Sequence, residues 1–225
     1  MISFYINEKL EDVNNIPKPS IEEVESYLKK WHSLEHYDCQ EKALNKLFFE
    51  LCPDNKDISS ILIKVATLND FYSTNIYRIF DVAKHIESLN HIENKSSVDE
   101  RLNNGNEDVS LVDDIKKVTM INKDNEEKEI NFYSFATKYC SHHKPEYYPI
   151  YDKYVDVILR YFRREDNFYK FKNDDLKEYC QFKNIITQFM KFYKLDNYTF
   201  KEIDMYLWQL GKYYFGDEYT ISSEI

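Results

Sequence analysis

Residues 132–140 read Phe-Tyr-Ser-Phe-Ala-Thr-Lys-Tyr-Cys, and residues 148–155 read Tyr-Pro-Ile-Tyr-Asp-Lys-Tyr-Val. The first segment predicts a helix from Phe132 to Ser141. A bend at Lys144-Pro145 follows. The second segment predicts another helix that begins near Tyr151, because apolar residues recur there at helical spacing: Val155, Ile158, Leu159 and Phe162. The sequence therefore predicts two helices joined by a short bend.

Helical spacing and helix-start signals continue on both sides of this pair. Capping-box patterns open two helices, one at Ser20-Ile-Glu-Glu23 that runs to about Ser33, and one at Thr199-Phe-Lys-Glu202 that ends at Gly211. The polar stretch 91–107 is expected to be a loop. The other expected helices are one around residues 44–51, one at 61–68 capped by Asp57 or Ser59, one that starts at Thr74, one at 109–118 and one at 176–193.

Composition supports an all-α fold. The chain has 3 Gly and 5 Pro in 225 residues, and folds rich in tight β-turns need more of both. Hydrophobic residues make up 43%, enough to build a core. We expect a single globular domain of eight or nine helices over residues 20–215, with a lead-in at 1–19 and a tail at 216–225. One small hairpin is expected to pair residues 118–121 with 130–132.

Charge and cysteine content limit the classes of function. The formal net charge is −10, which argues against an unspecialised nucleic-acid coat protein. Residues 144–212 hold 13 Lys and Arg against 11 Asp and Glu, so the acidity lies mainly elsewhere. The four cysteines are widely spaced, which is typical of free thiols in a reducing compartment. Neither a signal peptide nor a membrane span is evident, and a cytoplasmic location without membrane association is expected.

Lys138 and Asp152 are the residues with the clearest chemical use. A lysine amine is a nucleophile when a desolvated pocket keeps it neutral. An aspartate at a helix N-terminus can stabilise a developing cation, and cleavage of an N-glycosidic bond creates one on the sugar. The simpler interpretation is that Asp152 caps the following helix and that Lys138 is an ordinary helical lysine.

The segment from Ser134 to Leu159 resembles the core of the helix-hairpin-helix DNA glycosylase superfamily, which includes endonuclease III and the 8-oxoguanine glycosylases. The resemblance implies that Lys138 is the nucleophilic lysine and that Asp152, in Pro149-Ile-Tyr-Asp152, is the essential aspartate. It implies excision of a damaged or modified base, lyase activity through a lysine Schiff base, and DNA as the partner, in duplex or single-stranded form. The four-cysteine iron–sulfur motif of endonuclease III is absent, and no cofactor is expected.

A second segment, Leu68-Asn-Asp-Phe-Tyr-Ser-Thr74, is similar to the superfamily's Leu-Ser-x-Gln-x-Thr segment, whose polar side chains line the base pocket. This resemblance implies that Asn69, Tyr72 and Ser73 bind the substrate. Ser134 and Tyr151, in the first segment, are also expected to bind it.

Other patterns leave alternatives open. Residues 133–137 lack the glycines of the superfamily's hairpin, and the chain is acidic. Both facts favour a catalytically inactive helical module that binds a partner protein or nucleic acid in a mobile-element or defence system. Arg78 and His85 are similar to the signature of helical HEPN ribonucleases. Cys140-Ser-His142-His143 looks like a metal-binding fragment, but no second ligand cluster completes it, so no metal is predicted.

Overall fold

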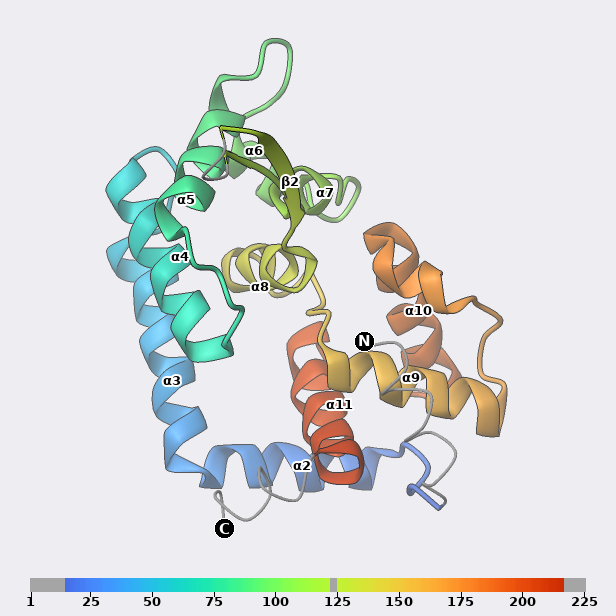
Figure 1. Cartoon of the computed structure of the whole chain (residues 1–225). Coiled ribbons are helices and arrows are strands. Elements are labelled where there is room, and N and C mark those ends of the chain that lie inside the picture. Colours follow the sequence, from blue (N-terminus) through green and yellow to red (C-terminus); the bar gives the residue numbers. More distant parts are fainter. Residues whose placement is uncertain (1–14, 122–124, 217–225) are drawn as a thin grey trace. The chain divides into compact units, whose positions relative to one another are not determined.

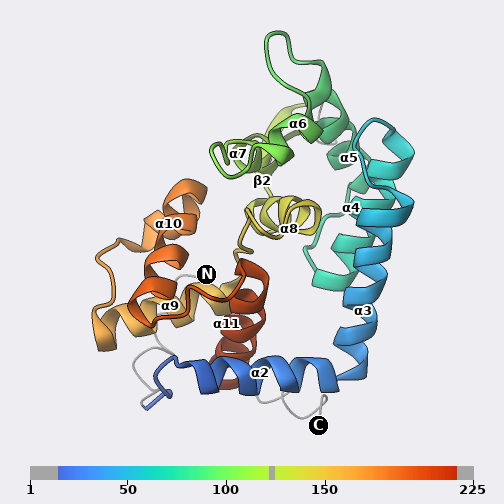
Figure 2. The ribbon, with the colours of Figure 1, turned by 180° about the vertical axis from the view of Figure 1, so that it is seen from behind.

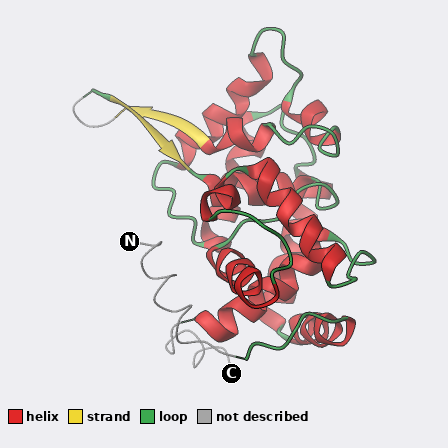
Figure 3. Cartoon of the chain, turned by 90° about the vertical axis from the view of Figure 1, so that its right-hand side faces the viewer, coloured by secondary structure: helices red, strands yellow, loops and turns green. Residues whose placement is uncertain are grey.

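The computed structural model describes residues 15–121 and 125–216, and the fold over these residues is all-α, as predicted. Ten α-helices and one two-stranded hairpin are present in the described residues (Figure 3). The expected lead-in and tail fall largely outside this range. The chain divides into two compact units, one of residues 35–150 and one of residues 1–34 with 151–225, and each is described by itself.

The unit that contains both ends of the chain has four α-helices in its described part (Figure 2). They are α2 (Ile21–Ser33), α9 (Lys153–Asp166), α10 (Tyr179–Phe192) and α11 (Phe200–Phe215), with a 3-10 helix, η3 (Asn173–Lys177), before α10. The two predicted helix starts are confirmed, because the hydroxyl oxygens of Ser20 and Thr199 accept hydrogen bonds from the backbone three residues ahead. The core of this unit is strongly aromatic, with Phe162 and Phe168 both against Phe189.

The predicted end of the last helix at Gly211 is wrong. Helix α11 continues through Gly211 to Phe215, and Gly211 is buried where α11 meets α9. A Cβ atom at this position would lie 2.5 Å from the backbone oxygen of Tyr154. Gly211 therefore serves as the point of close approach between two helices rather than as a helix stop.

The unit of residues 35–150 holds six α-helices and the hairpin (Figure 1). The helices are α3 (Glu35–Lys46), α4 (Ile58–Tyr72), α5 (Ile79–Ser88), α6 (Val98–Asn103), α7 (Leu111–Lys116) and α8 (Tyr133–His143). A π-helix, η1 (Leu47–Leu51), continues α3, and a 3-10 helix, η2 (Leu89–His91), follows α5. Strands β1 (Lys117–Ile121) and β2 (Glu127–Asn131) pair antiparallel, with Val118 opposite Ile130, as the expected hairpin requires.

Two predictions within this unit are wrong. Thr74 does not start a helix. The Asn69 side chain accepts hydrogen bonds from the Thr74 hydroxyl and the Ile76 amide, which holds a turn there, and α5 begins at Ile79. The stretch 91–107 is not only a loop, because it contains the short helix α6, whose Ser97 and Glu100 form a capping box.

Helix α8 is buried on nearly all sides. Ten of its eleven residues are buried, and only Ser134 is partly exposed. The helix contacts α4, α7 and η1. Because α8 carries lysine and histidine side chains as well as apolar ones, those polar groups need partners inside the protein. No helix in the described ranges has the length and apolar character needed to cross a membrane.

Candidate functional site

Lys138 lies in the middle of α8, with 2% of its surface exposed. Its Nζ donates a hydrogen bond to Ser134 Oγ at 2.6 Å, one helical turn earlier. The same Nζ lies 5.2 Å from the centre of the Tyr72 ring, at the end of α4. The structure thus brings together three of the predicted site residues, one as the predicted nucleophile and two as predicted substrate-binding residues.

A histidine that was not singled out as a site residue holds the Tyr72 ring in place. Tyr72 Oη and His142 Nε2 are joined by a hydrogen bond of 2.8 Å. His142 follows Lys138 by one turn of α8, so both side chains lie on the same face of the helix. These contacts connect four side chains, which we call the Lys138 cluster: Lys138, Ser134, Tyr72 and His142.

Asn69 and Ser73 have local structural roles. Besides the bonds that Asn69 accepts, its amide donates to the Ile76 carbonyl oxygen at 3.1 Å. Ser73 follows the end of α4 in the left-handed conformation, with φ of 48°. Both residues shape the turn after α4.

Asp152 and Tyr151 belong to the other compact unit. Asp152 is the N-cap of α9, where its Oδ1 accepts a hydrogen bond from the Tyr154 amide at 2.9 Å. Tyr151 donates its hydroxyl to Asp156 Oδ2 at 2.8 Å. The capping role that sequence reasoning gave as the simpler interpretation is therefore present. The pairing of Asp152 with Lys138 stays a prediction from the sequence.

The residues behind the alternative interpretations are held by structural contacts. Arg78 forms an ion pair with Asp81 and donates to the Ile121 carbonyl oxygen. His85 Nε2 lies 2.8 Å from the Asp114 carbonyl oxygen. Within the described parts of the chain, no three His, Cys, Asp or Glu side chains are arranged to hold a metal ion.

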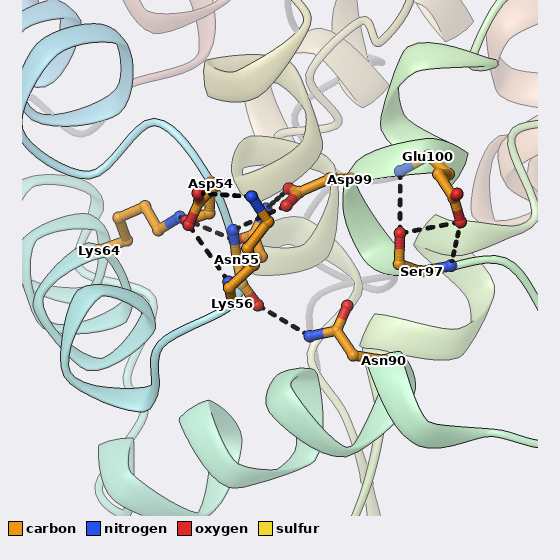
Figure 4. Close-up of polar contacts among 8 residues, drawn as sticks. All are labelled: Asp54, Asn55, Lys56, Lys64, Asn90, Ser97, Asp99 and Glu100. Carbon is orange, nitrogen blue, oxygen red and sulfur yellow. Dashed lines mark hydrogen bonds and ion pairs between the residues drawn. The ribbon is translucent and has the colours of Figure 1, made fainter.

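A second buried polar group centres on Lys64, in α4, and sequence reasoning missed it. The side chain is fully buried, and its Nζ has three neighbours: the Asp54 carbonyl oxygen at 2.7 Å, Asn55 Oδ1 at 2.7 Å and His143 Nε2 at 3.1 Å (Figure 4 shows the first two). An ammonium group has three N–H donors, so all three are used.

Asn55 connects Lys64 to a carboxylate. Its backbone N–H and side-chain Nδ2 donate to the two oxygens of Asp99, at 3.1 and 2.6 Å (Figure 4). Its Oδ1 also accepts from the Tyr139 hydroxyl, and its backbone oxygen accepts from Asn90 at 2.7 Å. The charge of Lys64 is therefore balanced by Asp99 through one amide side chain. The network joins the 52–57 loop to α4, α6 and α8.

Burial shifts the protonation of this network. It lowers the pKa of Lys64 from 10.5 to about 8. It also lowers the pKa of His143 well below 6.5, with the nearby Lys64 charge as the next largest cause. At neutral pH the pair is therefore a charged Lys64 that donates to a neutral His143. The sequence does not predict this contact, because Lys64 and His143 are 79 positions apart.

Comparison with known proteins adds a family. The family model HI_0787_N, described as an N-terminal domain, matches residues 23–147. The chain belongs to this family. It is also similar to an uncharacterized protein of Haemophilus influenzae, with 43% identity over 159 residues that cover 71% of this chain and 70% of the relative. No solved structure matches the chain.

The HI_0787_N match includes all residues of both buried groups. Lys64, Asn55, Asp99 and the members of the Lys138 cluster lie between residues 23 and 147, whereas Tyr151 and Asp152 lie beyond the matched range. Both groups therefore belong to the HI_0787_N part of the chain.

Proposed function

We propose that the protein is a DNA N-glycosylase-like enzyme that excises a damaged or modified base, with Lys138 as the nucleophile and lyase activity through a Schiff base. The observation that supports this most directly is the place of the Lys138 amine, buried between Ser134 Oγ and the Tyr72 ring. These three residues are among the seven that the sequence predicts for a glycosylase site.

The chemistry needs a neutral amine, and removal from water favours the neutral form of a lysine. The Nζ lone pair attacks C1′ of the sugar, and the bond between C1′ and the base breaks with its electron pair on the base. One amine proton is transferred to the departing base. The second is transferred to O4′ as the C1′–O4′ bond opens, which leaves an imine between Nζ and C1′. Hydrolysis of the imine releases Lys138.

The rest of the cluster positions the amine. Ser134 accepts from Nζ along the axis of α8, and the Tyr72 ring faces Nζ from α4. The face of an aromatic ring attracts a cation, so this arrangement also favours the positive charge that develops on nitrogen during attack. The substrate is a base that has left the DNA stack, because an amine inside a folded domain cannot reach C1′ within an intact duplex.

Asp152 is the proposed electrostatic partner of the sugar cation. This assignment comes from the Pro149-Ile-Tyr-Asp152 segment and from the place of the Asp152 carboxylate at the N-cap of α9. The Asp152 carboxylate accepts from the Tyr154 amide at the N-terminus of α9.

Borohydride trapping tests the proposal. The protein is incubated with duplex and single-stranded oligonucleotides that carry modified bases, and borohydride reduces any imine to a stable covalent adduct. We expect an adduct with the native protein and none with Lys138→Gln, which keeps a donor for Ser134. Lys128→Gln, in the exposed strand β2, is the matched control and should trap normally. Equal trapping by Lys138→Gln would overturn the role of Lys138.

The second candidate, a non-catalytic interaction module, is favoured by the net charge of −10 and by the absence of glycine from residues 133–137. It predicts a folded protein that gives no adduct with any modified base and that binds a protein partner instead of DNA.

A further inference from the structure

A cleft of about 660 Å³ lies in the unit of residues 35–150, beside the Lys64 network. Its walls come from η1, the 53–56 loop, η2, α6 and the end of α8. None of Lys138, Tyr72 or Ser134 lines it. The volume falls in the range of pockets that bind small molecules, roughly 300–1,000 Å³.

His143 supplies one directed hydrogen-bond donor to this cleft. The side chain is 5% exposed and lines the cleft. The Lys64 ammonium can only donate, so His143 Nε2 must accept from it, and the ring hydrogen then sits on Nδ1. Nδ1 has no hydrogen-bond partner among the residues that the structure describes. It is therefore available to an acceptor atom of a ligand.

Helix α6 supplies acceptors to the cleft. Asp99 and Glu100, at the beginning of α6, both line the cleft. Each Asp99 oxygen accepts one hydrogen bond from Asn55, and the Ser97 amide and hydroxyl both donate to Glu100 Oε2 (Figure 4). A carboxylate has about four acceptor positions, so both side chains retain capacity for donors of a ligand.

The charges around the cleft balance. Asp54, Asp99 and Glu100 line it, and the cations are Lys56 and Lys144 on its walls with Lys64 directly behind His143. Lys56 is paired with Asp54 at 3.1 Å. Hydrogen bonds lower the pKa of Asp54 and of Glu100, so both are ionised at neutral pH. Three negative and three positive groups favour an uncharged polar ligand over an anion or a polyamine.

Two aromatic rings complete the site. Phe48 is buried in the wall, and Phe49 is 51% exposed at the edge of the cleft. An exposed ring that lines a cleft with polar groups is a surface on which a flat heterocycle can stack.

We propose that this cleft binds a neutral nucleobase or nucleoside, with its ring against Phe49, an acceptor atom on His143 Nδ1–H and an amino group on Asp99 or Glu100. Among small uncharged molecules, nucleobases combine a flat ring with donors and acceptors on one edge. The proposal does not depend on the glycosylase activity, because the two sites share no residue.

Nuclear magnetic resonance and calorimetry with the full chain test the site. The probes are deoxyadenosine, deoxyguanosine, deoxycytidine and thymidine, each also as the 5′-monophosphate, with spermidine and arginine as charged comparisons. We expect at least one nucleoside to shift the amide signals of residues 48–56 and 97–103. The added phosphate should not strengthen binding.

Matched variants locate the ligand. Phe49→Ala should weaken nucleoside binding about tenfold, which is the loss expected from one stacking contact. Phe80→Ala removes a similarly exposed ring, 54% exposed and outside the cleft, and should leave binding unchanged. His143→Gln should also weaken binding. If this substitution of a buried residue unfolds the protein, the exposed Phe49→Ala still tests the proposal. The proposal is overturned if no nucleoside binds at millimolar concentration, if a charged comparison binds instead, or if Phe49→Ala and Phe80→Ala bind equally well.

Discussion

A buried ammonium group is stable only when acceptors surround it, and Lys64 has three within 3.1 Å. Lys64 does not contact the Asp99 carboxylate directly, because the Asn55 side chain accepts from Lys64 and donates to Asp99. Burial therefore lowers its pKa from 10.5 to about 8. The protein folds in spite of the cost of keeping this lysine charged at neutral pH.

The sign of the resulting pH dependence follows from this pKa. The unfolded chain binds the proton more tightly than the folded chain between pH 8 and 10.5, so the free energy of unfolding rises with pH in that window. We expect a gain of roughly 2 kcal/mol between about pH 7.5 and about pH 9.5. Lys64→Met should lack this gain, whereas Lys128→Met should keep it. Urea unfolding at the two pH values measures the difference, and equal pH dependence in native protein and Lys64→Met would contradict it.

Tyr72 is expected to matter through its ring. Tyr72→Leu removes the surface that faces Lys138 Nζ and should lower the single-turnover rate of base excision about tenfold. Tyr72→Phe keeps the ring and removes the hydroxyl that bonds to His142, so it should retain most of the rate. If the two variants lose the same activity while circular dichroism shows both folded, the ring does not position the amine.

Sequence reasoning found part of this chemistry. Ser134 and Lys138 are four residues apart on one helix, so their contact follows from helical geometry alone. Tyr72 was assigned through the resemblance of a second segment. Sequence reasoning did not find the Lys64 network, because its members come from a loop, two helices and the end of α8, and only folding brings them together. The sequence around a lysine in an apolar helix does not indicate which hydrogen-bond acceptors will surround it after folding.

At the scale of helices, Gly211 sets how closely α11 approaches α9. Gly211→Ala would place a Cβ atom 2.5 Å from the Tyr154 backbone oxygen, and backbone cannot move aside as a flexible side chain does. We expect a loss of about 1–3 kcal/mol in the free energy of unfolding. Tyr213→Ala, two positions on and largely exposed, should cost less than about 1 kcal/mol. Thermal unfolding compares them, and a neutral Gly211→Ala would show that the helices can separate freely.

Helix boundaries were predictable where capping residues mark them. Ser20 and Thr199 open α2 and α11 as expected, because their side chains satisfy amides that the helix leaves unpaired. The predictions at Thr74 and Gly211 were wrong because neither residue marks a helix boundary. The Asn69 side chain accepts hydrogen bonds from the Thr74 hydroxyl and the Ile76 amide, so no helix begins at Thr74. Gly211 allows close packing within a helix that continues past it. A residue type alone does not tell these uses apart.

Over the whole molecule, net charge separates the two candidate functions. A glycosylase must neutralise backbone phosphates with local cations even though the chain carries −10. We expect binding to a duplex that weakens as salt rises, with a linear fall of the logarithm of the binding constant against the logarithm of salt concentration. Fluorescence anisotropy over a range of salt measures the slope. A flat response, or no binding at low salt, would favour the interaction module.

The all-α fold was predictable from composition, since 3 Gly and 5 Pro leave few tight turns. The division into two compact units was not predictable. Pro145 and Pro149 lie just before the second junction, but they predict a bend between two helices, and residues 29–39 around the first junction contain neither glycine nor proline. The first junction is a single residue, Leu34, between α2 and α3. Such a short connection leaves no change in composition to detect.

The identity of the trapped residue tests the central claim most directly. Native protein is reduced with borohydride in the presence of a modified-base oligonucleotide, digested, and analysed by peptide mass spectrometry. We expect the sugar remnant to be attached to Lys138. A remnant on another lysine, or an adduct that forms equally in Lys138→Gln, would contradict it.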